Sequence, residues 1–305
     1  MSRTVALLVN PTAGKGKGEA AGRLAAERLA AAGITVERLV GADADGALRL
    51  GRAAVARGVD ALVAVGGDGM IHLALQCVAG TSTPLGAVAT GTGNDFATLL
   101  GLPIHDPLAA ADVIAADVVR SVDAARLSWA DEGRWFAGVM SSGFDSAVNE
   151  RANRMSWPRG RARYNIAIVA ELGVFSPLPF SVTVDGATIE REAMLVAVGN
   201  GISYGGGMKI CPGARLDDGL LHVTVLGKLG KPEFLRVFPT VYKGTHIEHP
   251  TVEVLVGREV RIMAPGAIAY ADGERIAPLP VTATCVPGAL RMLVPATTDL
   301  GRPIA

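Results

Sequence analysis

The feature that most constrains this chain is a pattern that occurs four times in its first 125 residues: a short, mostly apolar run and then an alanine-rich segment with helical periodicity. The apolar runs lie at residues 5–9, 35–40, 61–65 and 84–89, and the helical segments at 19–32, 45–57, 70–79 and 95–100. Strands without polar alternation are buried on both faces, and intervening helices let them pair in parallel. We therefore predict a doubly wound parallel sheet with a ligand crevice at the carboxyl ends of its strands.

From about residue 127 the pattern changes to shorter apolar runs separated by Gly, Pro and Asp. The runs lie at residues 180–184, 194–198, 221–226, 252–256, 260–263 and 281–285, with helical segments near 164–172 and 231–242. Such a pattern is typical of an antiparallel β-sandwich. A length of 305 residues fits two cores, so we expect an α/β domain over residues 1–126, completed by 292–305, and a β-rich domain over 127–291.

The composition excludes several classes of protein. With 29 basic and 29 acidic residues the net charge is zero, so no overall field attracts nucleic acid or an anionic membrane. Cys77, Cys211 and Cys285 have no Cys-x-x-Cys spacing, which argues against a zinc site or a disulfide framework. The one stretch long enough to span a bilayer, residues 61–80, contains Asp68 and a glycine-rich break. We therefore expect a soluble cytoplasmic protein that binds no nucleic acid.

Three glycine-rich turns follow three of the predicted strands, at residues 10–18, 66–69 and 91–95. Turns without side chains that lead into a helix let backbone N–H groups approach phosphate oxygens. None of the three has the spacing of a P-loop or of a Rossmann dinucleotide motif. Together at one sheet edge they predict a polyphosphate site.

Six motifs, in this order along the chain, resemble those of soluble bacterial diacylglycerol kinases and of the wider diacylglycerol, sphingosine and ceramide lipid-kinase superfamily. They are Asn10-Pro with its glycine-rich turn and residues 66–69, 91–96, 143–145, 216–221 and 272–274. Residues 149–164, 204–207 and 238–246 resemble the actinobacterial branch. The resemblance covers nearly the whole chain. It implies a nucleotide domain like that of NAD kinase and phosphofructokinase, followed by a lipid-binding β-sandwich.

The resemblance implies a kinase that transfers the γ-phosphoryl group of ATP to a lipid hydroxyl, with diacylglycerol as the expected acceptor and phosphatidic acid as the product. Phosphoryl transfer needs a phosphate cradle, a divalent cation and a group that orients or deprotonates the hydroxyl. Asp68 and Asp95 are the implied oxygen ligands of the Mg²⁺ carried by ATP, and Glu274 is the implied general base. The implied nucleotide-binding residues are Asn10, Thr12, Gly66, Gly67, Asp68, Gly69 and Thr92.

Two positions depart from the family pattern. The family binds a structural Mg²⁺ at positions that correspond here to Arg215, Asp218 and the carbonyl of Leu220, and arginine has no lone pair for a cation. The ion is therefore absent, shifted to Asp217 or replaced by the guanidinium charge. Met70 stands where the family usually has Thr, and losing that hydroxyl removes one hydrogen bond, worth about 0.5–1.5 kcal/mol.

A basic segment at residues 151–163 is the expected contact with the inner face of the membrane. Its basic side chains, each worth about 1 kcal/mol near an anionic surface, would bind lipid headgroups while the Trp inserts at headgroup depth. A solvated basic loop is the alternative. The residues are Arg151, Arg154, Trp157, Arg159, Arg161 and Arg163.

Two other functions remain open at this stage. NAD kinase shares the Gly-Gly-Asp-Gly turn but is disfavoured by the motifs at 143–145 and 272–274, and a catalytically idle lipid-binding or regulatory protein is suggested by Met70 and Arg215. Apolar strand edges in the second domain also permit a homodimer. His72, on the helix after Gly69, is assigned no role, because such a histidine more often packs in a core.

Overall fold

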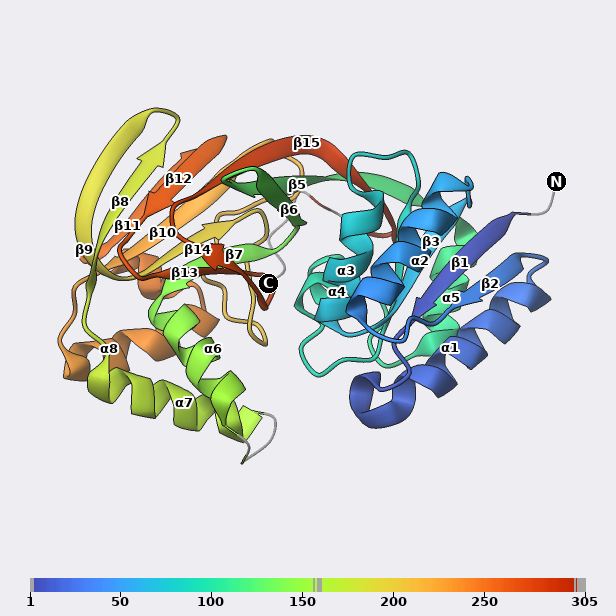
Figure 1. Cartoon of the computed structure of the whole chain (residues 1–305), viewed down its shortest axis with the longest axis horizontal. Helices are drawn as coiled ribbons and strands as arrows, with labels where there is room; N and C mark the ends of the chain where they lie inside the picture. Colours follow the sequence, from blue (N-terminus) through green and yellow to red (C-terminus); the bar gives the residue numbers. More distant parts are fainter. Residues whose placement is uncertain (1–2, 156, 158–160, 299, 301–305) are drawn as a thin grey trace.

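The computed structural model of the protein describes residues 3–155, 157, 161–298 and 300, with the side chains of residues 161–165 outside that description. The first domain contains a parallel sheet in the strand order β4-β3-β1-β2 (Figure 1). Its strands are β1 (Thr4–Val9), β2 (Thr35–Leu39), β3 (Ala61–Gly66) and β4 (Leu85–Ala89). Its helices are α1 (Ala13–Ala31), α2 (Ala44–Ala56), α3 (Asp68–Val78), α4 (Asp95–Leu99) and α5 (Pro107–Ala116).

Helices cover both faces of this sheet, which confirms the doubly wound prediction. Side chains of α2 and α3, such as Ala54 and Leu75, pack with Leu8 of β1 on one face. Side chains of α1 and α5, such as Leu29 and Ile114, pack with the opposite face. The strands β1, β3 and β4 are mainly apolar because their side chains meet one of these two helical layers, whereas the edge strand β2 carries Glu37 and Arg38.

The second domain is built mainly from antiparallel strands, as predicted. Its strands are β5 (Val119–Trp129), β6 (Glu132–Phe136), β7 (Val139–Gly143), β8 (Leu178–Val184), β9 (Ala187–Gly199), β10 (Leu221–Gly227), β11 (Val252–Gly257), β12 (Glu259–Met263), β13 (Ile268–Ala271), β14 (Glu274–Pro278) and β15 (Val281–Leu293). Its helices are α6 (Phe144–Arg154), α7 (Arg161–Val174) and α8 (Lys231–Val237), with 3₁₀ turns η1 (Phe238–Tyr242) and η2 (Thr245–Glu248). These helices lie together below the strands in Figure 1.

Strands β5 and β15 connect the two domains (Figure 1). They pair antiparallel along most of their length, and at the end of β15 Met292 pairs in parallel with Leu85 of β4. Leu293 and Val294, at most 1% exposed, then pack in the two cores of the first domain. The chain therefore returns to the first domain near its C-terminus, while the predicted boundary at residue 126 falls within β5.

Within the described ranges, no helix is both long and apolar enough to cross a membrane. This agrees with the interpretation of residues 61–80 as the buried strand β3 followed by the amphipathic helix α3.

Candidate active site

The three glycine-rich turns lie at the carboxyl ends of β1, β3 and β4 and touch one another at the backbone. A Cβ atom added to Gly91 would lie 2.6 Å from the Cα of Gly67, and one added to Gly14 would lie 2.4 Å from the carbonyl oxygen of Thr90. No side chain fits in either gap. The backbones of the three turns therefore meet at one edge of the sheet, where the sequence analysis expects the ligand crevice.

The first turn is shaped by its own polar residues. Asn10 Oδ1 accepts hydrogen bonds from the backbone N–H of Thr12 at 3.1 Å and from its hydroxyl at 2.9 Å. Gly14, Lys15 and Gly16 then have φ angles of 59°, 63° and 90°, so the regular part of α1 begins only after them. Asn10 and Thr12, which are predicted to bind the nucleotide, thus lie on the first turn, and the exposed Thr92 lies on the third.

Asp68 is the first residue of α3 and is mostly buried. Its Oδ2 accepts the backbone N–H of Asn94 at 2.7 Å, whereas its Oδ1 is buried without a partner among the described residues. Burial is the main cause that raises the pKa of this carboxyl, and the charges of Asp95 and Asp272 raise the pKa further, against backbone hydrogen bonds that lower it. Burying a charge without a partner is unfavourable, so this oxygen fits a cation or a water held by one.

Two more buried oxygen atoms on the third turn lack partners within the described part of the chain: Oγ1 of Thr90 and Oδ1 of Asn94. Asn94 has a left-handed φ of 58° and is anchored through its other amide atom, which donates to the carbonyl of Gly91 at 2.9 Å. Most buried polar atoms in folded proteins are hydrogen-bonded. Polar atoms left without partners at one crevice therefore indicate a polar ligand.

Asp95 and Asp68 both approach the position that a Cβ atom on Gly93 would take. A Cβ atom on Gly93 would be 2.6 Å from Oδ2 of Asp68 and 3.5 Å from Oδ2 of Asp95. The Asp95 carboxylate accepts backbone N–H groups of Gly206 and Gly207, from the second domain, at 2.8–3.1 Å. The carboxylate expected to bind Mg²⁺ thus also holds a turn of the second domain.

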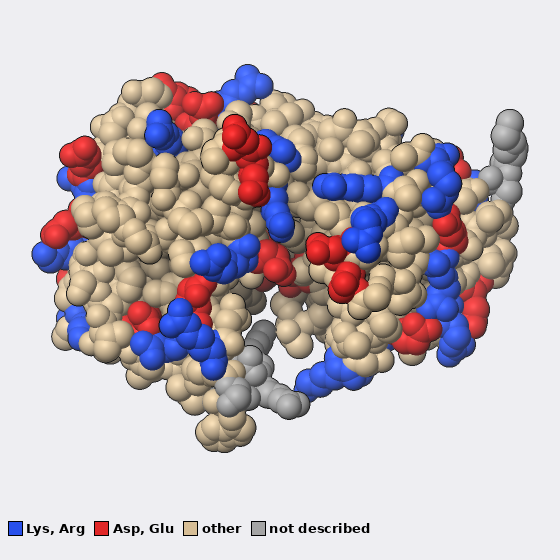
Figure 2. Space-filling model, viewed as in Figure 1, with Lys and Arg blue, Asp and Glu red and all other residues tan. Residues whose placement is uncertain are grey.

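Glu274 approaches the crevice from the second domain. It begins β14, after a tight turn in which Asp272 and Gly273 have φ angles of 50° and 85°. Its side chain is exposed, and its Oε1 would be 2.8 Å from a Cβ atom on Gly69. The carboxylate therefore lies against the second glycine-rich turn, where the resemblance places it. Figure 2 shows acidic side chains gathered where the two domains meet, beside a hollow between them.

Met70 does not point into the crevice. It is 7% exposed and packs in the core of the first domain, with its Cβ 2.7 Å from the position of a Cβ on Gly66. The methionine that stands where the family usually has Thr is therefore accommodated in the core of the first domain.

The positions of the family's structural Mg²⁺ are engaged in other contacts. The guanidinium of Arg215 lies 3.3 Å from Oδ1 of Asp217, and Oδ1 of Asp218 accepts the N–H of Leu220 at 3.0 Å. The imidazole of His222, whose pKa is lowered mainly by burial, lies 3.8 Å from Asp218. Arg215 thus pairs with Asp217, which is not one of the family's ligand positions, and the three alternatives above stay predictions.

Two hollows lie next to α6 in the second domain. One is a narrow apolar cavity of about 30 Å³ lined by side chains that include Phe144, Tyr204, Met208 and Phe234. Tyr204 and Met208 flank the glycine turn that holds Asp95, so the wall of this cavity adjoins the crevice. The second hollow, of about 580 Å³, lies between α6, α7 and β13 and has charged residues at its rim.

Several residues at these sites were missed by the sequence analysis. Glu150, on α6, accepts hydrogen bonds from the hydroxyl of Tyr270 at 2.7 Å and from Arg275 at 2.8 Å, and these contacts lower its pKa. His72 contacts Asp272. The only signal for Arg275 and Tyr270 was their proximity to Glu274 in the sequence.

Comparison with known proteins identifies both halves of the chain. Residues 4–127 match the model of the diacylglycerol kinase catalytic domain, and residues 138–294 match that of the YegS C-terminal NAD kinase beta sandwich-like domain. A diacylglycerol kinase of Mycobacterium tuberculosis is 45% identical over 294 residues, which is 95% of each chain. A protein of Xanthomonas oryzae named "Probable lipid kinase YegS-like" is 34% identical over 79% of this chain and 81% of its own.

Solved structures show the same fold. A diacylglycerol kinase from Bacillus anthracis superimposes with a TM-score of 0.73 over 98% of each chain, at 22% identity. An NAD kinase from Archaeoglobus fulgidus in complex with ATP superimposes with a TM-score of 0.53 over 96% of this chain and 93% of its own, at 15% identity. At these identities the likeness concerns the fold alone.

Replacing Asp68 by Asn should separate stability from activity. The pKa of Asp68 is raised in the folded protein, so the protonated carboxyl stabilises the fold. This stabilisation is complete below about pH 4, the pKa of an Asp side chain in the unfolded chain. It is lost as the pH rises through the pKa of Asp68 in the folded protein. Asp68→Asn should therefore resist urea as well as or better than the wild type at pH 7, with no difference near pH 4. Kinase activity should fall about 100-fold or more, as when one preorganised contact to a transition state is lost.

The matched control is Asp131→Asn, at an exposed turn between β5 and β6. It should change neither the pH dependence of urea unfolding nor the activity. A fully active Asp68→Asn enzyme would exclude Asp68 from the reaction.

Removal of divalent cations tests whether the guanidinium of Arg215 replaces the structural ion. If the guanidinium replaces the structural ion, extensive dialysis against EDTA should leave the melting temperature unchanged. A structural ion present at 100 times its Kd would instead stabilise the fold by about 2.7 kcal/mol. A drop in melting temperature that Mg²⁺ restores would show that the ion site is retained.

Proposed function

The chain belongs to the family of diacylglycerol kinases and YegS-like lipid kinases, and from this membership we propose that it transfers the γ-phosphoryl group of ATP to diacylglycerol, giving phosphatidic acid and ADP. That the chain is a lipid kinase, a phosphotransferase with an alcohol as acceptor, follows from the family. The nucleotide, the metal and the acceptor are parts of the proposal. The observation that carries it is the meeting of Glu274 with the glycine-rich turns of the other domain.

The three turns support a triphosphate at the crevice. Their backbones touch at positions where a side chain would clash with the neighbouring turn, and buried atoms without partners among the described residues lie on Asp68, Thr90 and Asn94. In phosphoryl transfer, catalysis is almost entirely positioning and electrostatic stabilisation. Rigid turns are suited to that task because they hold the phosphates without reorganising.

Asp68 and Asp95 fit a divalent cation that accompanies the nucleotide. Their carboxylate oxygens both lie near the position of a Cβ on Gly93, and one oxygen of Asp68 is unused by the described residues. Mg²⁺ is commonly bound by one or two carboxylates together with phosphates and water. When bound, it would neutralise the charge that develops on the transferred group.

Glu274 is the group that would accept the proton of the acceptor hydroxyl. The lipid oxygen forms a bond to the γ-phosphorus as the bond between that phosphorus and the bridging oxygen of ADP breaks. The hydroxyl proton passes to a Glu274 carboxylate oxygen and from there to water. Because a carboxylate is a weak base for an alcohol, this transfer occurs as the phosphorus–oxygen bond forms. The carboxylate of Glu274 is exposed beside Gly69, so it is open to the acceptor hydroxyl and to water.

The apolar cavity supports a lipid acceptor. Its lining is almost entirely hydrocarbon, and the Tyr204–Met208 turn separates it from Asp95 and the crevice. At about 30 Å³ it has room for about two water molecules. An acyl chain would therefore enter only as the surrounding helices α6 and α8 move apart.

Transfer of label from γ-³²P-ATP tests the proposed reaction. With mixed vesicles that contain diacylglycerol, label should appear in chloroform-extractable phosphatidic acid. Glu274→Gln should lower this rate about 100-fold, the lower range for loss of a general base, without a large change in the KM for ATP. Glu190→Gln, an exposed site on β9, is the matched control.

The other functions predict different outcomes in this assay. An NAD kinase would label NAD in the aqueous phase instead of the lipid. A catalytically idle lipid-binding protein would label neither acceptor. Label in another lipid but not in phosphatidic acid would show that the protein is a lipid kinase whose acceptor is not diacylglycerol.

A contact with the membrane surface is the second part of the proposal. The charge available for it is smaller than the sequence indicates, because Arg151 pairs with Glu171 at 2.5 Å and Arg154 lies 3.6 Å from Glu150. The side chains of Arg159, Arg161 and Arg163 lie outside the described residues.

Apolar side chains at the same end of the molecule support insertion into lipid. Trp157 is 79% exposed, and Ile166 and Val169, one turn apart on α7, are 46% and 69% exposed. We expect these side chains to enter the inner surface of the cytoplasmic membrane, with the arginines of the basic segment at the anionic headgroups.

Val169→Asp should weaken binding to anionic vesicles about tenfold, since burying a valine contributes about 1.5 kcal/mol and 1.4 kcal/mol corresponds to tenfold in affinity. Vesicle co-sedimentation measures the effect, and turnover of a short-chain, water-soluble acceptor should be unchanged. Val256→Asp, at a site 47% exposed on β11, is the control. Equal binding by Val169→Asp and the wild type would place the contact elsewhere.

A further inference from the structure

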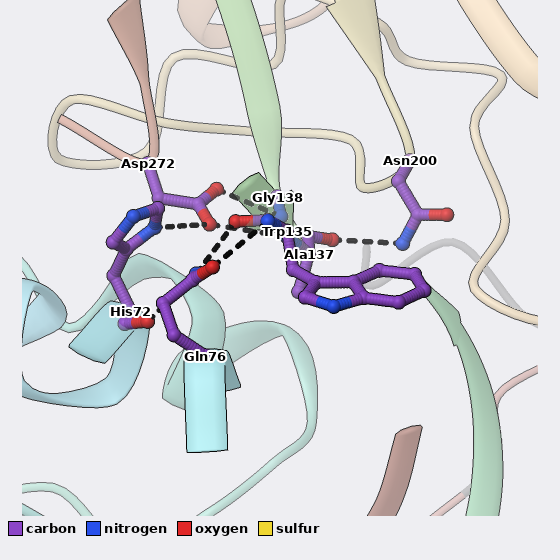
Figure 3. Close-up of polar contacts among 7 residues, drawn as sticks. All are labelled: His72, Gln76, Trp135, Ala137, Gly138, Asn200 and Asp272. Atoms are coloured by element: carbon purple, nitrogen blue, oxygen red, sulfur yellow. Dashed lines mark hydrogen bonds and ion pairs between the residues drawn. The ribbon is translucent and has the colours of Figure 1, made fainter. Parts of the chain in front are cut away.

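One face of helix α3 carries two polar side chains that contact the second domain. His72 and Gln76 are four residues apart, so they lie one above the other on the helix. Figure 3 shows Gln76 directed at the backbone of Trp135 in β6 and His72 directed at Asp272, the residue after β13. The first residue of the same helix is Asp68. The helix therefore connects the proposed nucleotide turn to the domain that carries Glu274.

Gln76 binds the backbone of Trp135 in β6. Its Oε1 accepts the Trp135 N–H at 2.9 Å, and its Nε2 donates to the Trp135 carbonyl at 2.8 Å (Figure 3). The amide group thus satisfies both backbone groups of one residue. Two hydrogen bonds in one plane fix the orientation of the side chain as well as its distance.

His72 binds the carboxylate that shapes the Glu274 turn. Its Nδ1 lies 3.2 Å from Oδ2 of Asp272, and the Asp272 carboxylate also accepts the backbone N–H groups of Ala137 at 3.0 Å and Gly138 at 2.9 Å (Figure 3). An ionised carboxylate only accepts hydrogen bonds, so Nδ1 carries the proton. The imidazole is 5% exposed, and its contact is shielded from water.

We propose that His72 and Gln76 are positioning residues that set the distance between Glu274 and the proposed nucleotide turn. Asp272 precedes Glu274 by two residues, and His72 follows Asp68 by four. The hydrogen bond between His72 and Asp272 is therefore a short link between the carboxylate proposed as base and the turn that holds the phosphates. The inference rests on the proposed lipid kinase activity, because it assigns these residues an effect on its rate.

Positioning predicts a change in kcat that is larger than any change in stability or substrate binding. A displacement of about 1 Å in a reacting group can cost about 100-fold in rate. A merely structural role would lower the amount of folded enzyme and leave the kcat of the folded fraction unchanged. The two roles therefore differ in the split between kcat and KM and in the response to a conservative substitution.

His72→Phe should lower kcat about 10-fold to 100-fold by this estimate, with the KM for ATP unchanged within about a factor of three. His72→Asn should recover most of the rate, because the amide nitrogen of Asn is as many bonds from the backbone as Nδ1. Cys77→Ala, on the face of α3 that packs against α2, is the matched control for loss of packing. It should lower the melting temperature without lowering kcat.

Hydrogen exchange gives a measurement that does not depend on activity. The amides of Ala137 and Gly138 donate to Asp272, so they should exchange faster in His72→Phe, in which Asp272 loses one of its supports. Asp272→Asn should have the same effect more strongly, since an amide group cannot accept at both positions, while Asn still tolerates the left-handed φ of the turn. Exchange in Cys77→Ala should match the wild type at these two amides.

The outcomes separate this inference from the proposed function. If the wild type labels lipid and His72→Phe keeps its kcat, the positioning role is wrong and the kinase assignment stands. If the wild type labels no lipid, the kinase proposal fails, and unchanged exchange at Ala137 and Gly138 would also exclude the link. Should His72→Phe not fold, Gln76→Met applies the same test, with a lower kcat expected and an unchanged kcat contradicting the role.

Discussion

The crevice depends on a steric constraint at the backbone: three turns from three different strands must touch. They touch because glycine occupies the points of contact, with Gly67 against Gly91 and Gly14 against the carbonyl of Thr90. A methyl group at these positions would lie closer than van der Waals contact to the neighbouring turn and would force the turns apart. The close approach of Asp68 and Asp95 beside Gly93 depends on this contact.

Features that depend on neighbours in the sequence could be predicted from it. The apolar runs predicted the parallel sheet, because periodicity is a local property of the sequence. The start of helix α1 was not predicted correctly from local patterns. The sequence places it near residue 19, whereas the helix begins at Ala13 and is interrupted by three residues with positive φ.

Features that depend on distant residues could not be predicted. His72 and Asp272 are 200 residues apart, and Asp95 binds an N–H group 111 residues away. Both contacts join the two domains, and no spacing rule indicates them. The arginine-rich segment shows the same limit for charge, because Glu171 follows Arg151 by 20 residues and pairs with it across two helices. A linear count of arginines therefore overstates the free charge.

The return of β15 to the first domain has a consequence for biosynthesis. Met292, Leu293 and Val294 are at most 1% exposed and fill cores whose other members come mostly from the first 125 residues or so. A chain that emerges from the ribosome in order leaves those cores incomplete until residues 292–294 have left the exit tunnel. Contacts of such long sequence separation form late. The domain that is synthesised first is therefore completed last, and a truncated chain would leave its apolar floor open to chaperones and proteases.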